Sequence, residues 1–141
     1  MKRSALSLIA LVLLLTCVLA VPASAAEPAE EITVSPRFVD IRMISTSIDV
    51  NSSGKASCYT FVDTANSSYT INISMSLQRY KNGGWTNVKT WTTSGTGEVS
   101  LDKSYYVSSG YYYRTAVAAT VYTSGGTYVE TGYGYSQNDY Y

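Results

Sequence analysis

The sequence predicts an all-β protein, an antiparallel β-sandwich of about seven strands. Short runs rich in Val, Ile, Thr and Tyr recur along the chain and are separated by turns of Gly, Asn and Ser. No long stretch shows the hydrophobic periodicity of a helix. Many short strands with regular turns are typical of a sandwich or a small barrel, because each strand must bury one face against a second sheet.

The first 25 residues have the three parts of a secretory signal peptide. Lys2 and Arg3 form a positive start, an apolar run from Leu6 to Leu19 follows, and Ala23-Ser24-Ala25 is a small-residue cleavage site. The apolar run is shorter than the roughly 20 residues that cross a bilayer. We therefore expect an extracellular protein cleaved near Ala25, with no membrane insertion after cleavage, in preference to a retained anchor.

Removal of 25 of the 141 residues leaves 116, the size of one ordinary domain. Because Lys2 and Arg3 leave with the signal, 8 basic and 10 acidic residues remain. This balance argues against nucleic acid as a partner, since phosphate binding needs clustered positive charge. Cys58 is then the single cysteine, so no internal disulfide is expected. We expect a buried Cys58 and keep a reactive or intermolecular thiol as the alternative.

Residues 26–40 are expected to form a flexible leader or an edge segment, because they begin polar and Pro36 excludes a central strand position. The sandwich domain is expected over residues 41–141. Its first strand is predicted from Ile41 to Val50, with an irregularity near Ile44. The second is predicted from Lys55 to Thr64; its alternation does not decide which face points inward, the one with Ala56, Cys58, Thr60 and Val62 or the one with Tyr59 and Phe61.

The strand from Thr70 to Tyr80 has the clearest alternation in the chain. Its apolar residues recur at every second position, which predicts one buried and one solvated face, and they are Ile71, Ile73, Met75 and Leu77. A tight turn at residues 81–84 leads into a return strand from Trp85 to Thr92 that contains a bulge or twist. After a break at residues 94–97, a short strand is expected from Glu98 to Leu101. Residues 102–109 are expected to form a corner that connects this strand to the last hairpin.

The segment from Val107 to Tyr135 predicts the last hairpin. It contains two runs rich in Tyr, Val and Thr, joined across Ser124-Gly125-Gly126-Thr127. Residues Val107, Gly110, Tyr111, Tyr113 and Arg114 resemble the sixth strand of immunoglobulin-like and fibronectin type III-like sandwiches. This resemblance implies that Tyr111 is the corner tyrosine that bonds back to the chain, and that the inward residues are Tyr113, Thr115, Val117, Ala119 and Val121.

A wider resemblance covers nearly the whole chain after the signal. The stretch LQRYKNGGWTNVKTW, followed by GYYYRTAV and a Gly-Gly hairpin, is similar to small secreted single-domain proteins of Gram-positive, mainly clostridial, bacteria. These relatives have no assigned activity. The resemblance therefore implies an immunoglobulin-like fold and an extracellular location, and it implies no substrate.

The residue types argue against catalysis, and we predict no catalytic, cofactor-binding or metal-binding residues. The chain has no His, which excludes a Ser-His-Asp triad, a Cys-His dyad and histidine-containing zinc sites. The acidic residues show no spacing that pairs two carboxylates on one strand face, as acid–base glycoside hydrolysis requires. No Asp-rich loop of the calcium-binding type is present. We therefore predict that the protein is not an enzyme and needs no cofactor.

Aromatic surface remains as the candidate for function, because 11 of the 14 tyrosines lie at or after Tyr105. Tyr112, Arg114 and Tyr122 are expected on the face opposite the core, with Arg114 between aromatics where cation–π contact is possible. A three-residue hairpin loop would place Tyr122 opposite Glu130, whereas a two-residue loop would place Glu130 beside Val121. The first register keeps the acid away from the core and is preferred. The candidate binding strip is therefore Tyr112, Arg114, Tyr122 and Glu130.

The leading hypothesis is a secreted, non-enzymatic binding or interaction module. Its partner would be a cell-wall glycan, a host glycan or a protein. A secreted antimicrobial or interbacterial effector, and a structural subunit that assembles through its edge strands, are the alternatives. The sequence does not fix the oligomeric state.

Overall fold

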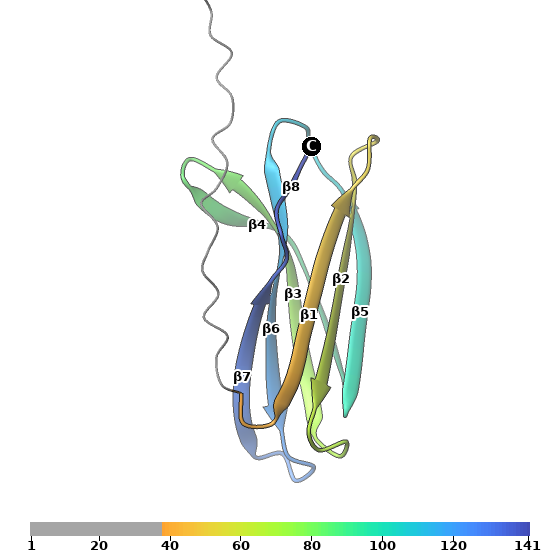
Figure 1. The fold of residues 1–141 in the computed structure, drawn as a ribbon, viewed down its shortest axis with the longest axis vertical. Helices are drawn as coiled ribbons and strands as arrows, with labels where there is room; N and C mark the ends of the chain where they lie inside the picture. The colour runs from red at the N-terminus through yellow and green to blue at the C-terminus, as the bar shows by residue number, and fades with distance from the viewer. Residues whose placement is uncertain (1–37) are drawn as a thin grey trace, which may run out of the picture.

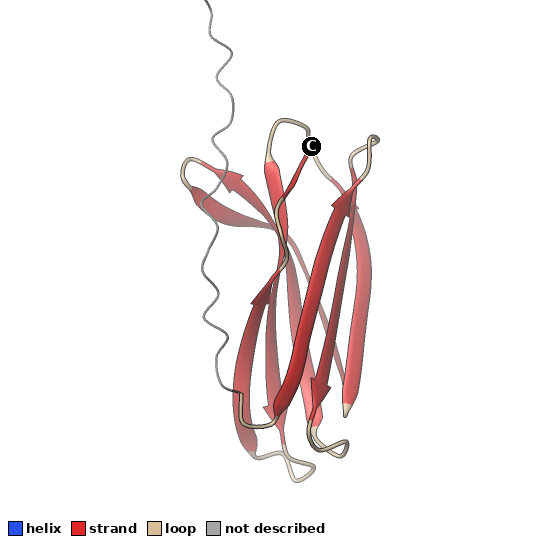
Figure 2. Ribbon diagram, in the orientation of Figure 1, coloured by secondary structure: helices blue, strands red, loops and turns tan. Residues whose placement is uncertain are grey.

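The computed structural model describes residues 38–141, and every regular element in this range is a β-strand (Figures 1 and 2). The predicted all-β antiparallel sandwich is confirmed. No helix within residues 38–141 is long and apolar enough to cross a membrane. The predicted signal peptide and most of the predicted leader lie outside the described residues. The strands are β1 (Ile41–Val50), β2 (Lys55–Thr64), β3 (Thr70–Lys81), β4 (Gly84–Thr96), β5 (Glu98–Tyr106), β6 (Tyr112–Tyr122), β7 (Tyr128–Tyr135) and β8 (Asp139–Tyr140).

The strands form two antiparallel sheets that pack face to face. One sheet has the order β1-β2-β5 and the other has the order β4-β3-β6-β7, while the short β8 pairs with the start of β6. Figure 1 shows β1 and β2 in front of β3 and β6. The C-terminus and the β3–β4 turn lie at the upper end in this view, and the β6–β7 turn lies at the lower end. These two ends are called upper and lower below.

The core forms where the inward faces of the two sheets meet. The alternating apolar residues of β3 are all buried, as their period of two predicts. β2 turns inward the face that carries Ala56, Cys58, Thr60 and Val62, which settles the choice that its alternation left open. The inward face predicted for β6 is also confirmed, since its members are all buried, namely Tyr113, Thr115, Val117, Ala119 and Val121.

Two strands extend several residues past their predicted bounds, and one strand was not predicted. β5 continues to Tyr106, where a corner was expected, because the whole of it pairs with β2 from Glu98 onward. β4 continues through the predicted break and ends at Thr96, and the chain turns at Gly97, whose φ is +70°. The expected bulge in β4 is confirmed by the register shift beside Leu77. β8 was not predicted.

The edge strand β1 packs closely against β7 of the other sheet, because β7 has glycines at the points of contact. Gly132 and Gly134 face β1, and a Cβ at Gly132 would lie 2.7 Å from Ile44 Cδ1. Glycine is therefore required for this close approach. The hydroxyl of Thr115 on β6 also donates a hydrogen bond of 3.2 Å to the Ser47 carbonyl of β1.

Two carboxylates bind the backbone at opposite ends of β1. Glu130 on β7 accepts hydrogen bonds from the N–H groups of Val39, Asp40 and Ile41, at 3.1, 2.7 and 2.7 Å. Asp139 on β8 accepts one from the Val50 N–H at 2.6 Å. These contacts satisfy edge groups that would otherwise be available for pairing with another chain.

Candidate binding surface

The hairpin of β6 and β7 does not have the register that the sequence favoured. Glu130 pairs with Val121, and Tyr122 pairs with Tyr128, because a bulge separates these two pairs. The preference for Tyr122 opposite Glu130 is therefore wrong. The argument against the observed register was that it turns an acid inward, and this cost is offset because Glu130 binds three backbone N–H groups at the sandwich edge.

The carboxylate of Glu130 is held in its charged form by these donors. Burial alone would raise its pKa, but the N–H groups of Asp40, Ile41 and Val39 favour the anion and lower the pKa below its ordinary value. The hydrogen-bond partners of Glu130 therefore lie at the start of β1 and in the two residues before it. Glu130 does not lie on the outer face with the other members of the predicted strip.

Arg114 lies between two aromatic rings on the outer face of the β4-β3-β6-β7 sheet. Its guanidinium carbon is 4.3 Å from the ring centre of Trp85 on β4 and 4.2 Å from that of Tyr135 on β7. Its Nε donates a hydrogen bond of 2.9 Å to Oε1 of Gln78 on β3. Although Arg114 is on the outer face, only 7% of its surface is exposed. Both rings are therefore fixed by a buried cation.

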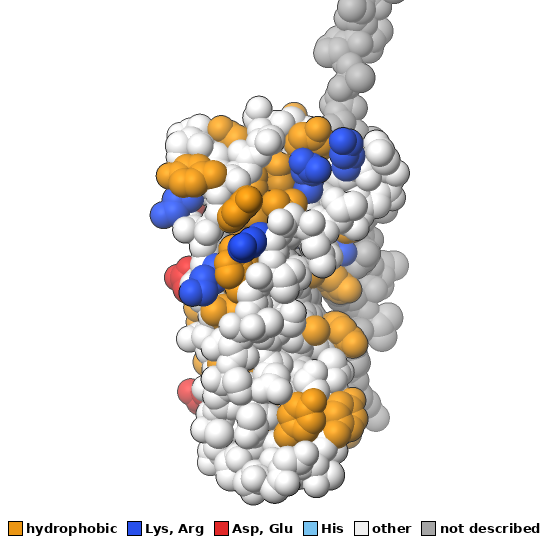
Figure 3. Space-filling model, turned by 180° about the vertical axis from the view of Figure 1, so that it is seen from behind, with side chains coloured by type: hydrophobic (Ala, Val, Ile, Leu, Met, Phe, Trp, Pro, Cys, Tyr) orange, Lys and Arg blue, Asp and Glu red, His pale blue; other side chains and the backbone are white. Residues whose placement is uncertain are grey.

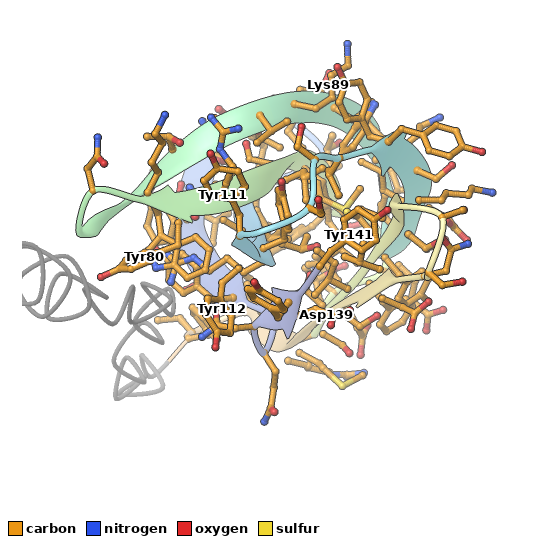
Figure 4. The ribbon with its side chains drawn as sticks, turned by 90° about the horizontal axis from the view of Figure 1, so that it is seen from above. Tyr80, Lys89, Tyr111, Tyr112, Asp139 and Tyr141 are labelled. Carbon is orange, nitrogen blue, oxygen red and sulfur yellow. The ribbon has the colours of Figure 1, made fainter. Side chains whose placement is uncertain are left out.

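Further aromatic residues extend this cluster toward the upper end. The rings of Tyr80 and Trp85 are 5.2 Å apart, and those of Tyr112 and Tyr140 are 5.0 Å apart. Figure 4, which looks down on the upper end, shows Tyr80 of β3 and Tyr112 of the neighbouring β6 on the same side of the sandwich. We call this group the upper aromatic cluster, and its members are Tyr80, Trp85, Tyr112, Arg114, Tyr135 and Tyr140.

The predicted strip is divided by the structure. Tyr112 and Arg114 share the outer face and belong to the upper aromatic cluster, as predicted. Tyr122 is on the same face but at the opposite end of β6, about 30 Å along the strand from Tyr112 by the usual rise of 3.3 Å per residue. There it packs edge-on against Tyr128, with 6.1 Å between ring centres. We call Tyr122 and Tyr128 the lower aromatic pair.

The tyrosine whose hydroxyl bonds back to the chain is Tyr113 and not Tyr111. The Tyr113 hydroxyl donates a hydrogen bond of 2.6 Å to the Ser108 carbonyl, five residues back, and its ring is buried. Burial raises the pKa of Tyr113, and the nearby Arg79 cation opposes this shift. Tyr111 instead lies under the guanidinium of Arg79, 4.7 Å from the ring centre, at the upper end (Figure 4).

Between the two aromatic groups the outer face is polar and nearly uncharged. Figure 3, seen from behind, shows hydrophobic side chains interspersed with Lys and Arg toward the upper end, further hydrophobic side chains at the lower end, and mostly uncharged surface between them. On β3 and β4 this middle region consists of three cross-strand pairs, which we call the polar strip. Its pairs are Asn72 with Ser94, Ser74 with Thr92, and Ser76 with Thr90.

Hydrogen bonds fix the outer pairs of the polar strip and leave the middle pair open. The Ser94 hydroxyl donates to Asn72 Oδ1 at 2.7 Å, and the hydroxyls of Ser76 and Thr90 are 2.8 Å apart. No side-chain hydrogen bond within residues 38–141 engages the hydroxyls of Ser74 and Thr92. A shallow hollow of about 460 Å³ lies here, and its lining includes both residues of this middle pair.

The described residues do not bring together a constellation for metal binding. Within residues 38–141 no three His, Cys, Asp or Glu side chains gather at one place. Cys58 is buried in the core as predicted, and burial raises the pKa of its thiol, which disfavours the reactive thiolate. A polar hollow at the lower end contains Arg42 and Asp63, whose charged atoms are 3.9 Å apart.

The sequence did not reveal the partners of Arg114. Trp85 and Tyr135 come from β4 and β7, so their meeting with Arg114 depends on strand order and on the register of two hairpins. The sequence pattern that could have indicated this contact is the alternation within each strand, which places Trp85, Gln78 and Arg114 on the outward faces of β4, β3 and β6. This pattern predicts that the three side chains meet only when the strand order β4-β3-β6-β7 is known.

The comparisons with known proteins assign no family. A scan against protein-family models finds no model that matches this chain. A search of curated proteins finds no match either.

Proposed function

We propose that the chain is a secreted, non-enzymatic binding module that contacts a glycan or a protein through the upper aromatic cluster. The observation that carries this proposal is the pair of rings held on either side of Arg114. A buried cation between two rings fixes their positions before a ligand arrives. Binding then costs less side-chain entropy than it would with freely rotating aromatic side chains.

Several features support this proposal. Tyr and Trp present rigid amphipathic area, which is why they are enriched at recognition surfaces. Tyr135 is 40% exposed and Tyr140 is 54% exposed, so part of the cluster is accessible. The secreted location rests on the predicted signal peptide.

The strand arrangement agrees with the proposed immunoglobulin-like relationship. In that fold the first, second and fifth strands share one sheet and the third, sixth and seventh share the other. The orders β1-β2-β5 and β4-β3-β6-β7 share this division, except that β4 lies beside β3, whereas the fourth strand of the constant-type fold belongs to the first sheet. We include this relationship, and the similarity to small Gram-positive secreted proteins, in the proposal.

The test is a ligand search with the full chain, followed by single substitutions in the cluster. Glycan arrays and cell-surface pull-downs would identify the ligand, and titration would measure its affinity. We expect Trp85→Ala to weaken binding at least about tenfold, which corresponds to about 1.4 kcal/mol. Tyr106→Ala is the matched control, because Tyr106 is 69% exposed on β5, away from the cluster. Equal affinities for the two variants would refute the assigned surface.

A structural assembly subunit is the second candidate, and β4 favours it. This strand of 13 residues ends one sheet, and Lys89 is its one charged residue. A long edge strand with little charge can pair with the same strand of another chain. Sedimentation over a range of concentrations would test this candidate, and a monomer at every concentration would exclude it.

A further inference from the structure

We infer that the outer face of the β4-β3-β6-β7 sheet binds an uncharged polysaccharide along the polar strip, between the upper aromatic cluster and the lower aromatic pair. This inference rests on the proposed function and names its ligand class. It depends on the absence of charge, the open hydroxyls and the placement of the aromatic residues.

The charge pattern of the polar strip argues against ions as the main contacts. Among the outward positions of β3, β4, β6 and β7, which all lie in the described chain, Arg114 is the one charged residue. Arg114 is 7% exposed and already contacts two rings and Gln78. The polar strip itself carries no charged side chain; the exposed Lys89, next to Thr90, pairs with the inward-facing Leu77 and not with an outward residue. A neutral ligand is the match for a neutral face.

The polar strip has the hydrogen-bonding groups that a polyhydroxyl ligand needs. Each hydroxyl of Ser or Thr can donate one hydrogen bond and accept two, which is the capacity of a sugar hydroxyl. The open hydroxyls of Ser74 and Thr92 lie in the lining of the shallow hollow. Their neighbours on either side are held by hydrogen bonds between the strands. The strip is therefore ordered before binding.

The aromatic residues lie toward the two ends of the polar strip and on β7, and none lies at its centre. Tyr133 and Tyr135 lie outward on β7, with exposures of 59% and 40%, and Tyr128 of the lower pair is 59% exposed. Protein interfaces have the opposite arrangement, with aromatic residues buried in a central patch and polar groups at the rim. On β6, Ala116 and Ala118 separate the rings of β7 from the strip on β3. Exposed rings one strand away from hydroxyl rows suit a sugar chain, whose rings have apolar C–H faces and polar edges.

The dimensions favour a chain over a single sugar. From Asn72 to Ser76 the strip extends about 13 Å by the rise of a β-strand, and the two aromatic groups lie beyond it at both ends. The hollow is open to the outer surface and does not enclose a small ligand. A ligand that contacts both ends must therefore be extended.

The test uses the full chain with neutral and anionic polysaccharides. Depletion from solution by cellulose and chitin, and affinity electrophoresis in a soluble β-glucan, supply the neutral probes; alginate and dextran sulfate supply the anionic ones. We expect binding to at least one neutral probe, with an affinity that changes less than about twofold between about 0.05 M and about 0.5 M salt, because no ion pair is screened. Binding to no neutral probe, or to anionic probes alone, would overturn the inference.

Substitutions locate the site. Thr92→Glu places a charge on the exposed strip and should weaken neutral-probe binding at least about tenfold. Ser57→Glu is the matched control, because Ser57 is exposed on β2 in the other sheet, and it should leave binding unchanged. Equal effects of the two substitutions would contradict the inference. Circular dichroism confirms that both variants fold.

The outcomes separate this inference from the proposed function. If Trp85→Ala abolishes binding and Thr92→Glu does not, the upper aromatic cluster binds alone and the polar strip has no role. If the full chain binds a protein at the cluster and no neutral polysaccharide, the proposed function stands and this inference fails. A chain that binds neither class refutes both.

Discussion

Glu130 shows how one side chain can join two distant parts of the sandwich. Its two oxygens accept three hydrogen bonds from the backbone at the start of β1. A carboxylate that accepts several N–H groups is stabilised as an anion, and the lowered pKa of Glu130 follows from this geometry after the opposing effect of burial. The same geometry makes the contribution of Glu130 to stability dependent on pH.

We predict that Glu130→Gln lowers the free energy of unfolding at pH 7 by about 1 to 2 kcal/mol. The amide keeps one acceptor oxygen, but its NH₂ group replaces the oxygen that binds the Val39 N–H. Because the folded-state pKa lies below the ordinary value of 4.5, the contribution is complete above that value and is lost as the pH falls through the folded pKa. Urea unfolding of both proteins from pH 7 to pH 3 measures this difference.

The gap between wild type and Glu130→Gln should therefore close in acid. The exposed Asp49 supplies the control, and Asp49→Asn should change stability by less than about 0.5 kcal/mol at neutral pH. A gap that keeps its size at pH 3 would show that the loss comes from packing and not from the carboxylate.

Tyr113 provides a second test at the level of one residue. Tyr113→Phe removes the hydroxyl that donates to the Ser108 carbonyl and leaves the buried ring in place. We expect a loss of about 1 kcal/mol in the free energy of unfolding. Tyr111→Phe should cost less, because its hydroxyl donates no hydrogen bond to any residue in the described range 38–141. Chemical denaturation measures both losses. A larger loss for Tyr111→Phe would indicate that Tyr111, and not Tyr113, is the tyrosine that bonds back to the chain.

At the level of the element, β1 and β7 pack closely because β7 has glycine where other strands have side chains. A Cβ at Gly132 would lie 2.7 Å from Ile44 Cδ1, 2.8 Å from Phe38 Cε1 and 2.9 Å from Ile41 Cδ1. Three apolar side chains would have to move at once in a packed region. The cost of such overpacking is typically about 1 to 3 kcal/mol.

We therefore predict that Gly132→Ala destabilises the fold by about 1 to 3 kcal/mol, measured as a lower midpoint in thermal or urea unfolding. Gly125→Ala is the matched control, because its Cβ would meet only the Thr123 hydroxyl, at an ordinary 3.8 Å. We expect this control to be close to neutral. If both variants have the same stability, β1 does not pack on β7 as closely as described.

The elements also differ in how much the sequence revealed. β3 was predictable because Ile71 to Leu77 alternate with polar residues and one face is buried. The second half of β5 was not, because residues 102–106 are all exposed and carry no alternation. The β6–β7 register was missed because the preference for an outward Glu130 took no account of N–H donors from β1, more than 85 residues away in sequence.

At the level of the whole molecule, β1 connects the two sheets. It pairs with β2 in one sheet, while its side chains and backbone contact β6, β7 and β8 of the other. On the opposite side, β4 and β5 are joined by the turn at Gly97. Sequence patterns predicted the two faces of most strands. They could not predict which strands meet across the sandwich, since those contacts depend on the closed fold.

The two carboxylates that bind β1 allow a test of how the molecule unfolds. Glu130 binds the start of β1 and Asp139 binds its end, about 30 Å apart along the strand. Sites this far apart contribute independently when the whole sandwich unfolds in one step, so the losses for Glu130→Gln and Asp139→Asn should add within about 0.5 kcal/mol. A double-mutant cycle by urea denaturation at pH 7 measures the coupling. A coupling above about 1 kcal/mol would mean that β1 detaches from the rest of the sandwich as a separate unit once both ends are released.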